Sequence, residues 1–273
     1  MKTMENKFVL LNNISYGAHE RQKLDIFIPG KVKSDSGMIL FIHGGGWVEG
    51  DKSAHHSDAE FFCDRGYITA SMNYRYVSET LNVFDELDDI NLALKTIKNT
   101  CADYAYQIEK MIVSGGSAGA NLSLLYAYTR RDESPVIPVA ACVYCPPVNC
   151  AETDFLLGIS GEFESWKYEV LSKCCGCKIT KETFCDEPQQ QALRRMSPEV
   201  YLSADSAPTA VFHGKNDELV PIRHTYKFIS LLSEKGISND LLVYENSGHA
   251  LDKDPETALQ AKKIIEAYAQ RYL

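Results

Sequence analysis

A serine between glycines is the first residue of this chain whose setting indicates chemistry. Residues 115–119 read Gly-Gly-Ser-Ala-Gly, which fits the pattern G-x-S-x-G with Ser117 as its serine. The run KMIVSGG before it predicts a strand and the run GANLSLLYAYTRR after it predicts a helix, the context that this motif requires. Such a turn exposes the hydroxyl at a helix N-terminus, where negative charge is stabilised. The alternative, a phosphate-binding turn, is disfavoured because this stretch lacks the G-x-G-x-x-G spacing and a Lys-Ser/Thr ending.

A serine hydroxyl is a weak nucleophile and needs a base, so the seven histidines are the next residues to consider. His249 lies in the short stretch NSGHA, directly after an expected strand and before the last expected helix. His19 is expected before the core sheet, His43 in a glycine loop, and His55 and His56 exposed at a helix start. His213 is expected at a strand end and His224 within a helix. His249 is therefore the predicted base.

The third group should be a carboxylate that orients the imidazole and lies between serine and histidine in the chain. Asp217 follows the expected strand PTAVFHG directly, and its neighbour Glu218 is the second choice. Ser117, Asp217 and His249 each follow a strand, and the carboxyl ends of parallel strands meet at one edge of a sheet. We therefore expect the three side chains to lie together.

Three successive glycines follow another expected strand, in FIHGGGWVEGDKS at residues 41–53. Ordering glycine costs more conformational entropy than ordering any other residue, so this loop must need bare backbone. Trp47 is expected either to pack under the loop or to line a pocket, and His43 to hold the loop in shape. Four neighbouring residues are expected to brace the loop or fix the end of the next strand: Asp51, Lys52, Tyr74 and Arg75.

Expected strands and helices alternate along the chain. Two strands over 7–14 and 22–29 form an antiparallel pair, and the later apolar runs are typical of strands buried on both faces. The remaining strands are expected over 37–43, 67–74, 110–116, 139–145, 208–214 and 240–246, and helices over 56–65, 83–101, 119–131, 223–236 and 255–273. This order predicts an α/β fold, with a mostly parallel twisted sheet of about eight strands and helices on both faces.

The organisation is expected to be one domain over residues 1–273, with residues 148–205 as a cap or lid insertion. That segment mixes aromatic, acidic and cysteine residues without the alternation seen elsewhere. Its apolar residues could cover a pocket mouth, although packing of the cap on the sheet is the favoured interpretation: Phe155, Leu156, Leu157, Phe163 and Trp166.

Composition excludes several classes of function. Acidic residues outnumber basic ones by 37 to 28, and the net charge of -9 disfavours nucleic-acid binding. No segment has the run of apolar residues that a membrane span requires, and the first residues do not resemble a signal peptide. A cytoplasmic location is therefore expected. The sequence does not define an oligomeric state.

The nine cysteines are expected to be reduced thiols, because their number is odd and no export signal is recognised. Cys142 and Cys145 lie on an expected strand and point to opposite faces. Cys174, Cys177 and Cys185 could ligate zinc with a fourth group, but no histidine lies nearby in the sequence. Neither a metal nor a cofactor is predicted.

The chain resembles the α/β-hydrolase superfamily, in the esterase and lipase branch related to hormone-sensitive lipase. The resemblance runs from about residue 20 to the end and rests on five motifs: H-G-G-G-W at 43–47, N-Y-R at 73–75, G-G-S-A-G at 115–119, H-G-x-x-D at 213–217 and G-H at 248–249. It implies that the backbone N–H groups of Gly45, Gly46 and Ala118 form an oxyanion hole.

The function that these residues and the resemblance predict is a serine carboxylesterase. It is expected to hydrolyse small or medium acyl esters, including acetyl esters of sugars or aryl esters, through an acyl-enzyme on Ser117. Its partner is then a small-molecule ester. An arylformamidase-type amidase on the same fold is the alternative, and a non-catalytic ligand-binding homologue is a weaker one.

Overall fold

The computed structural model describes residues 8–34, 37–155 and 162–273, with the side chains of residues 162 and 163 also left aside. Eight strands form one sheet in the order β1-β2-β4-β3-β5-β6-β7-β8. Their bounds are β1 (Phe8–Ser15), β2 (Lys23–Pro29), β3 (Gly37–Ile42), β4 (Ile68–Met72), β5 (Lys110–Gly116), β6 (Ile137–Tyr144), β7 (Thr209–Gly214) and β8 (Asn239–Tyr244). The predicted α/β fold is confirmed.

The sheet is antiparallel at one end and parallel over the rest. β2 pairs antiparallel with both β1 and β4, as the sequence predicted for the first pair. From β4 through β3, β5, β6 and β7 to β8 every pairing is parallel. The carboxyl ends of these parallel strands therefore share one edge, where their loops meet.

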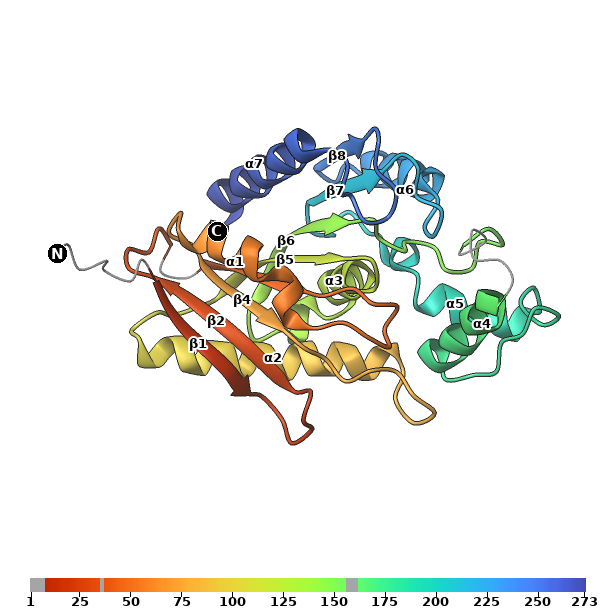
Figure 1. The fold of residues 1–273 in the computed structure, drawn as a ribbon, viewed down its shortest axis with the longest axis horizontal. Helices are drawn as coiled ribbons and strands as arrows, with labels where there is room; N and C mark the ends of the chain where they lie inside the picture. Colours follow the sequence, from red (N-terminus) through yellow and green to blue (C-terminus); the bar gives the residue numbers. More distant parts are fainter. Residues whose placement is uncertain (1–7, 35–36, 156–161) are drawn as a thin grey trace.

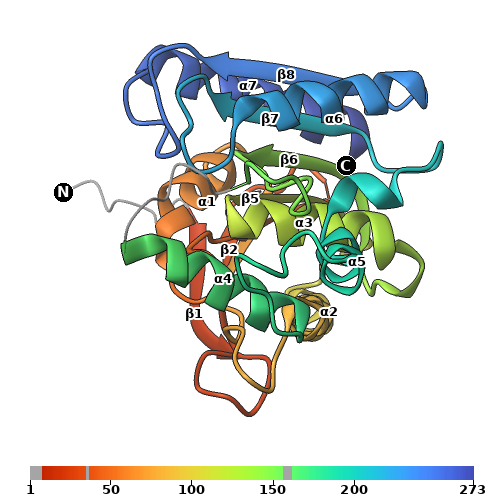
Figure 2. The ribbon, with the colours of Figure 1, turned by 90° about the vertical axis from the view of Figure 1, so that its right-hand side faces the viewer.

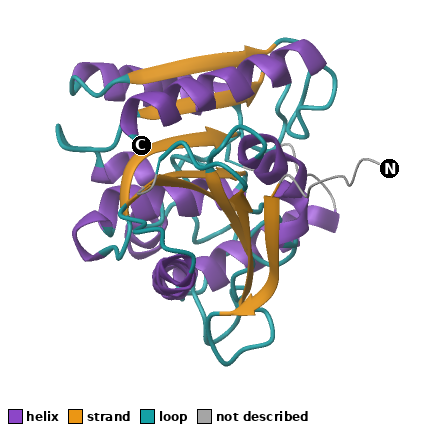
Figure 3. Ribbon diagram, turned by 90° about the vertical axis from the view of Figure 1, so that its left-hand side faces the viewer, coloured by secondary structure: helices purple, strands orange, loops and turns teal. Residues whose placement is uncertain are grey.

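Helices cover both faces of the sheet (Figures 1 and 3). The α-helices are α1 (His56–Cys63), α2 (Val83–Asp103), α3 (Ala118–Thr129), α4 (Glu162–Cys175), α5 (Glu187–Arg195), α6 (Ile222–Glu234) and α7 (Pro255–Tyr272). Three short 3₁₀ helices are η1 (Lys52–His55), η2 (Arg131–Glu133) and η3 (Pro198–Tyr201). Residues of α2, α3 and α6 share one buried apolar cluster, and residues of α1 and α7 share another. The buried core therefore has two parts, one on each face of the sheet.

Local sequence explains where the main helices begin and end. Asn82 and Asp85 form a capping box at the start of α2. The side chain of Asn82 accepts a hydrogen bond from the backbone N–H of Asp85, and the side chain of Asp85 accepts one from the backbone N–H of Asn82. Apolar residues three or four positions apart, among them Leu87, Ile90 and Leu94, form the buried face of this helix. Gly236 follows α6 with a φ of 72°, the left-handed conformation expected of a glycine there.

The segment between β6 and β7 carries α4, α5 and η3. It lies beyond the carboxyl ends of the strands, at the side of the molecule that faces the viewer in Figure 2. The buried side chain of Asn121 on α3 anchors it, because its Nδ2 donates to the carbonyl oxygens of Pro147 (2.8 Å) and Met196 (2.9 Å). Among the described residues, no helix is both long and apolar enough to span a membrane.

Candidate active site

Ser117 occupies a strained turn between β5 and α3. Its φ of 53° and ψ of -119° lie in a region that residues with a side chain rarely adopt. A Cβ added at Gly115 would lie 2.5 Å from the carbonyl oxygen of Gly119, and one added at Gly119 would overlap the carbonyl oxygen of Ile42. Glycine is therefore required at both positions. The turn places the serine hydroxyl at the N-terminus of α3.

His249 and Asp217 complete a chain of hydrogen bonds that starts at this serine. Nε2 of His249 lies 2.8 Å from Oγ of Ser117, and Nδ1 of His249 lies 2.7 Å from Oδ2 of Asp217. The three residues come from loops that follow β5, β7 and β8, as their positions in the sequence predicted. Glu218, the second choice for the carboxylate, is exposed to solvent.

The carboxylate of Asp217 is buried but well supplied with donors. Its Oδ1 accepts the backbone N–H groups of Leu219 and Val220, each at 2.9 Å. Nε2 of His213 lies 3.2 Å from Oδ2. Burial alone would raise the pKa of Asp217, but the hydrogen bonds from His213 and His249 hold that pKa well below its usual range. Asp217 is therefore ionised, and it fixes the His249 tautomer that leaves Nε2 free to accept a proton.

The three-glycine loop passes close to Ser117. A Cβ added at Gly44 would lie 3.2 Å from Cβ of Ser117 and 2.8 Å from the carbonyl oxygen of Gly116. Gly45 and Gly46 have φ values of 114° and 57°, and a Cβ at Gly45 would overlap the backbone of Glu49. Close approach and left-handed backbone conformations therefore explain the glycines. Gly45 and Gly46 line a pocket together with Ser117, and Ala118 is the buried first residue of α3.

His43 stabilises the three-glycine loop from its buried side. Its ring is buried and stacks on Tyr74, with ring centroids 4.3 Å apart, and Nδ1 lies 2.7 Å from the carbonyl oxygen of Gly44. The hydroxyl of Tyr74 donates to the carbonyl oxygen of His43 at 3.0 Å. Burial lowers the pKa of His43 to about 4, so this imidazole is neutral near pH 7. The predicted role of His43 agrees with these contacts.

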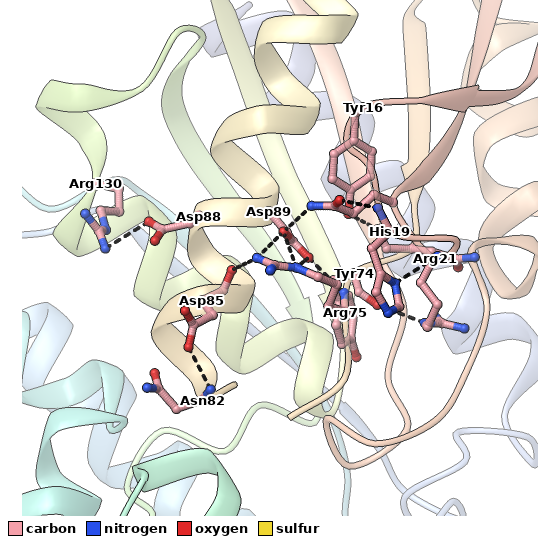
Figure 4. A network of polar contacts seen from close by, with 12 residues as sticks. Tyr16, His19, Arg21, Tyr74, Arg75, Asn82, Asp85, Asp88, Asp89 and Arg130 are labelled. Carbon is pink, nitrogen blue, oxygen red and sulfur yellow. Dashed lines mark hydrogen bonds and ion pairs between the residues drawn. The ribbon is translucent and has the colours of Figure 1, made fainter. Parts of the chain in front are cut away.

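Arg21, from the turn between β1 and β2, holds both ends of the same loop. Its Nη2 lies 3.3 Å from Nε2 of His43 and donates to the carbonyl oxygen of Gly50 at 3.1 Å, while Nε donates to the carbonyl oxygen of Tyr74 at 2.9 Å. Figure 4 shows Arg21 in this network. Sequence reasoning missed Arg21, because an arginine in a turn carries no signal of what its long side chain reaches.

Arg75 and Asp89 form the neighbouring part of the network (Figure 4). The fully buried carboxylate of Asp89 accepts hydrogen bonds from the backbone N–H and guanidinium of Arg75 and from Nε2 of Gln22. This pairing joins α2 to the chain that follows β4. The prediction that Tyr74 and Arg75 fix that strand end agrees with it.

Asp51 and Lys52 brace the far end of the loop, as predicted. Asp51 accepts from the backbone N–H of Ser53 (2.9 Å) and from Nδ2 of Asn73 (2.8 Å). Nζ of Lys52 lies 2.6 Å from Oδ2 of Asp25, a fully buried carboxylate on β2.

The prediction that His55 and His56 are solvated is wrong for His55 and only partly right for His56, whose side chain is 32% exposed. Nε2 of His56 lies 2.8 Å from Oδ2 of Asp25, and the His55 ring stacks on Phe41 with its side chain 13% exposed. A buried carboxylate must find partners, and His56 is one of them. That Asp25 is buried could not be read from the sequence.

Two pockets open beside Ser117 and His249. The larger has a volume of about 550 Å³ and the smaller about 240 Å³. Trp47 is 3% exposed and lines the smaller pocket, so both roles considered for it are realised. Among the apolar residues of the predicted cap, Phe155 and Trp166 also line this pocket. Leu156 and Leu157 lie outside the described residues, and so does the side chain of Phe163.

All nine cysteines are free thiols, and eight of them are at least partly buried. Among the described residues, one group of three potential metal ligands has its ligand atoms within 4.8 Å of one another, and it consists of Cys145, His213 and Asp217. The group considered from the sequence, Cys174 with Cys177 and Cys185, is not such a cluster in the described part of the chain.

Comparison with known proteins places the chain in a family. The family model named BD-FAE matches residues 24–232, which is well over half of the chain. The chain belongs to the BD-FAE family. The predicted place among α/β-hydrolases of the esterase and lipase type is confirmed.

Relatives of this BD-FAE chain carry esterase names. It is 27% identical to "Probable carboxylic ester hydrolase LipM" of Mycobacterium tuberculosis, over 95% of this chain and 62% of the relative. It is 21% identical to "Isoprenylcysteine alpha-carbonyl methylesterase ICME" of Arabidopsis thaliana, over 87% of this chain and 56% of the relative. The chain thus spans about three fifths of the length of these relatives.

Solved structures of similar fold include two esterases. One is titled "Truncated form of carbohydrate esterase from gut microbiota", with a TM-score of 0.73, 17% identity, and coverage of 95% of this chain and 98% of that one. Esterase B of Lactobacillus rhamnosis has a TM-score of 0.74 at 15% identity, over 98% of this chain and 88% of that one. At these identities the likeness concerns the fold of the BD-FAE chain.

Proposed function

We propose that this protein is a serine carboxylesterase that hydrolyses small or medium acyl esters. The observation that carries the proposal is the unbroken hydrogen-bonded chain from Ser117 through His249 to the ionised Asp217, beside two pockets. Ser117 acts as nucleophile, His249 as general base and then general acid, and Asp217 as the group that orients and stabilises the imidazole.

The reaction follows from the positions of these atoms. Nε2 of His249 takes the proton of Ser117 as Oγ attacks the ester carbonyl carbon, and negative charge develops on the carbonyl oxygen. We assign the backbone N–H groups of Gly45, Gly46 and Ala118 to that oxygen, where one such donor is worth about 3 kcal/mol. His249 then protonates the leaving alcohol, and a water activated by the same imidazole hydrolyses the acyl-enzyme.

The size of the pockets and the relatives support the substrate class. The smaller pocket, at about 240 Å³, holds a short acyl chain or a single ring, since a cavity of about 150 Å³ accommodates benzene. The names of the relatives above are those of ester hydrolases, which supports an ester over the arylformamidase and non-catalytic alternatives. Within this class we propose acetyl esters of sugars or aryl esters.

Residues 148–205 serve as a cap in this proposal, within a single domain over residues 1–273. The position of α4 and α5 beyond the strand ends supports it, and so does Trp166, which lies against the glycine loop. We also propose that the protein works in a reducing compartment, as in the cytoplasm, because none of its nine cysteines is paired.

Removal of the nucleophile tests the proposed function. The substitution Ser117→Ala should lower kcat for p-nitrophenyl acetate and butyrate by at least about 10³-fold, since the remaining site cannot form an acyl-enzyme. Ser203→Ala, which changes an exposed serine outside the site, is the matched control and should keep the wild-type rate. A fluorophosphonate probe should label the wild type and the control only. Equal rates in wild type and Ser117→Ala would overturn the assignment.

A further inference from the structure

Gly116, the residue before the nucleophile, is a glycine that the turn does not require. Gly115 and Gly119 are needed because a Cβ at either would collide with backbone. Gly116 differs from them, because a Cβ added there meets no atom of the described residues within 4 Å other than those of its two neighbours in the chain. Gly116 is also not among the glycines with positive φ. The fold would therefore accept a side chain here, and what the glycine provides is open space.

That space belongs to the larger pocket. Gly116 lines it together with Ser117 and His249, and so do residues of α1 and α7. Gly116 pairs with Tyr144 at the end of β6, and the carbonyl oxygen of Tyr144 accepts the N–H of Ser117 at 2.9 Å. A side chain at residue 116 would therefore project beside the reacting serine, into the volume that a substrate must use.

Both pockets have mostly apolar walls, but the larger one carries more polar side chains. The larger one is lined by the hydroxyl-bearing rings of Tyr144 and Tyr244 and by the ion pair between Lys262 and Asp58, with Nζ and Oδ1 2.8 Å apart. The smaller one is lined mainly by apolar side chains, among them Trp47, Phe155, Trp166, Leu219 and Val220, together with Glu49. The larger pocket thus offers more hydrogen-bonding side chains to a group with oxygen atoms, and the smaller one offers fewer.

The order of the two half-reactions decides which part of the ester occupies which pocket. The acyl group stays bound to Ser117 while water attacks, so it benefits from an enclosed apolar pocket. The alcohol leaves after the first step, and its polar groups are best matched by hydroxyl and charged side chains. Each pocket contacts His249, so the leaving oxygen can receive its proton from either side.

We propose that Gly116 opens an alcohol subsite in the larger pocket, and that the enzyme takes esters whose alcohol part is bulky and bears several oxygen atoms. The acyl part lies in the apolar pocket. This inference rests on the proposed esterase function and adds the residue that determines the size of the alcohol. Tyr144 and Tyr244 supply hydrogen bonds to that alcohol.

Two ester series measured on the same variants test the inference. The alcohol series consists of ethyl acetate, 1-naphthyl acetate and glucose 6-acetate, and the acyl series of ethyl acetate, butyrate and hexanoate. Gly116→Val should lower kcat/KM for the two bulky acetates by at least about 10-fold relative to ethyl acetate, and Gly116→Ala by less. All three members of the acyl series should change by one common factor. Tyr244→Phe should lower kcat/KM for glucose 6-acetate more than for 1-naphthyl acetate.

A variant in the other pocket is the matched control. Leu219→Ala should change the ratios within the acyl series and leave those within the alcohol series as in the wild type. Equal losses on every ester in Gly116→Val, or a selective loss within the acyl series, would overturn the subsite while leaving the esterase proposal intact. A wild type that is inactive on all five esters, and that no fluorophosphonate labels, would overturn the proposed function and this inference together.

Discussion

Asp217 shows at the scale of one residue how a buried carboxylate is kept charged. Two backbone N–H groups and two imidazoles face its oxygens, and the second imidazole, His213, is itself fixed by Thr225, whose Oγ1 lies 2.7 Å from Nδ1. A buried charge without such partners would neutralise itself by taking up a proton. The charge on Asp217 therefore depends on His213 as well as on His249.

Substitution of this carboxylate gives the residue-scale prediction. Asp217→Asn should lower kcat by about 10³- to 10⁴-fold with little change in KM, because an amide no longer fixes the productive tautomer of His249. Steady-state rates on p-nitrophenyl butyrate, with the circular dichroism spectrum as a check of folding, measure the effect. Glu218→Gln is the matched control and should retain activity, since Glu218 is exposed. If Glu218→Gln lowered kcat more than Asp217→Asn, Glu218 and not Asp217 would be the carboxylate that orients His249.

The proposed catalytic residues could be predicted from the sequence because each combines a motif with a position after a strand. Ser117, Asp217 and His249 were predicted in this way, and the structure brings them together. Two of the residues that support the site could not be predicted. Arg21 and Asp25 act through contacts with residues distant in sequence, and an isolated arginine or aspartate does not reveal such contacts.

Helix α2 illustrates the same limit at the scale of an element. Its apolar spacing predicted the helix correctly, yet its buried face also carries Glu86 and Asp89. Asp89 is paired with Arg75. Neither carboxyl oxygen of Glu86 has a hydrogen-bond partner in the described part of the chain. Burial, with a further effect of the nearby Asp89, raises the pKa of Glu86 well above its usual value.

A neutral replacement of Glu86 gives the prediction for this helix. The folded protein holds the Glu86 proton at a pH where the unfolded chain has lost it, so the free energy of unfolding should fall as pH rises above about 4.3. Glu86→Gln resembles the protonated form of Glu86. It should therefore remove the part of the decrease in the free energy of unfolding with rising pH that Glu86 causes. The variant should therefore be more stable than the wild type at pH 8 and equally stable near pH 4.

Urea denaturation at pH 4, 6 and 8 measures the difference between the two proteins. Asp88→Asn, on the exposed side of the same helix, is the control and should follow the wild-type slope. If Glu86→Gln also keeps that slope, Glu86 is not protonated in the folded protein.

The alternation of elements was predictable over most of the chain because apolar strands and amphipathic helices have distinct periods. It failed between β6 and β7, where α4 and α5 pack against other helices and the loops rather than on the sheet. With no strand period there and mixed polar and apolar residues, the local pattern did not define helix bounds. The polar lining of the larger pocket was equally hidden, because it comes from four separate elements.

For the whole molecule, buried histidines should set the acid limit of stability. Burial lowers the pKa of His43 to about 4, and burial with the neighbouring Arg223 lowers that of His224 to about 4, although Nε2 of His224 lies 2.8 Å from Oδ1 of Asp154. The unfolded chain takes up these protons near pH 6.5, so the free energy of unfolding should fall as pH drops from about 6.5 towards 4. This trend opposes the one expected from Glu86 over the same range.

Chemical denaturation of His224→Gln at pH 7 and pH 5 tests this expectation. The variant should lose less stability between the two pH values than the wild type, whatever its stability at pH 7. His19→Gln changes an exposed histidine and should lose as much as the wild type. Equal losses in all three proteins would show that His224 does not contribute to the acid limit.

The order of the three strand-end loops along the chain has a consequence for synthesis on the ribosome. The strained Ser117 turn follows β5, whereas His249 follows β8, the edge strand that comes last in sequence among the described strands. A nascent chain can therefore fold much of the sheet while its serine still has no base. Under the proposed mechanism, hydrolysis begins only after β8 and the loop that carries His249 have been made, so nascent chains that lack this loop are inert towards esters.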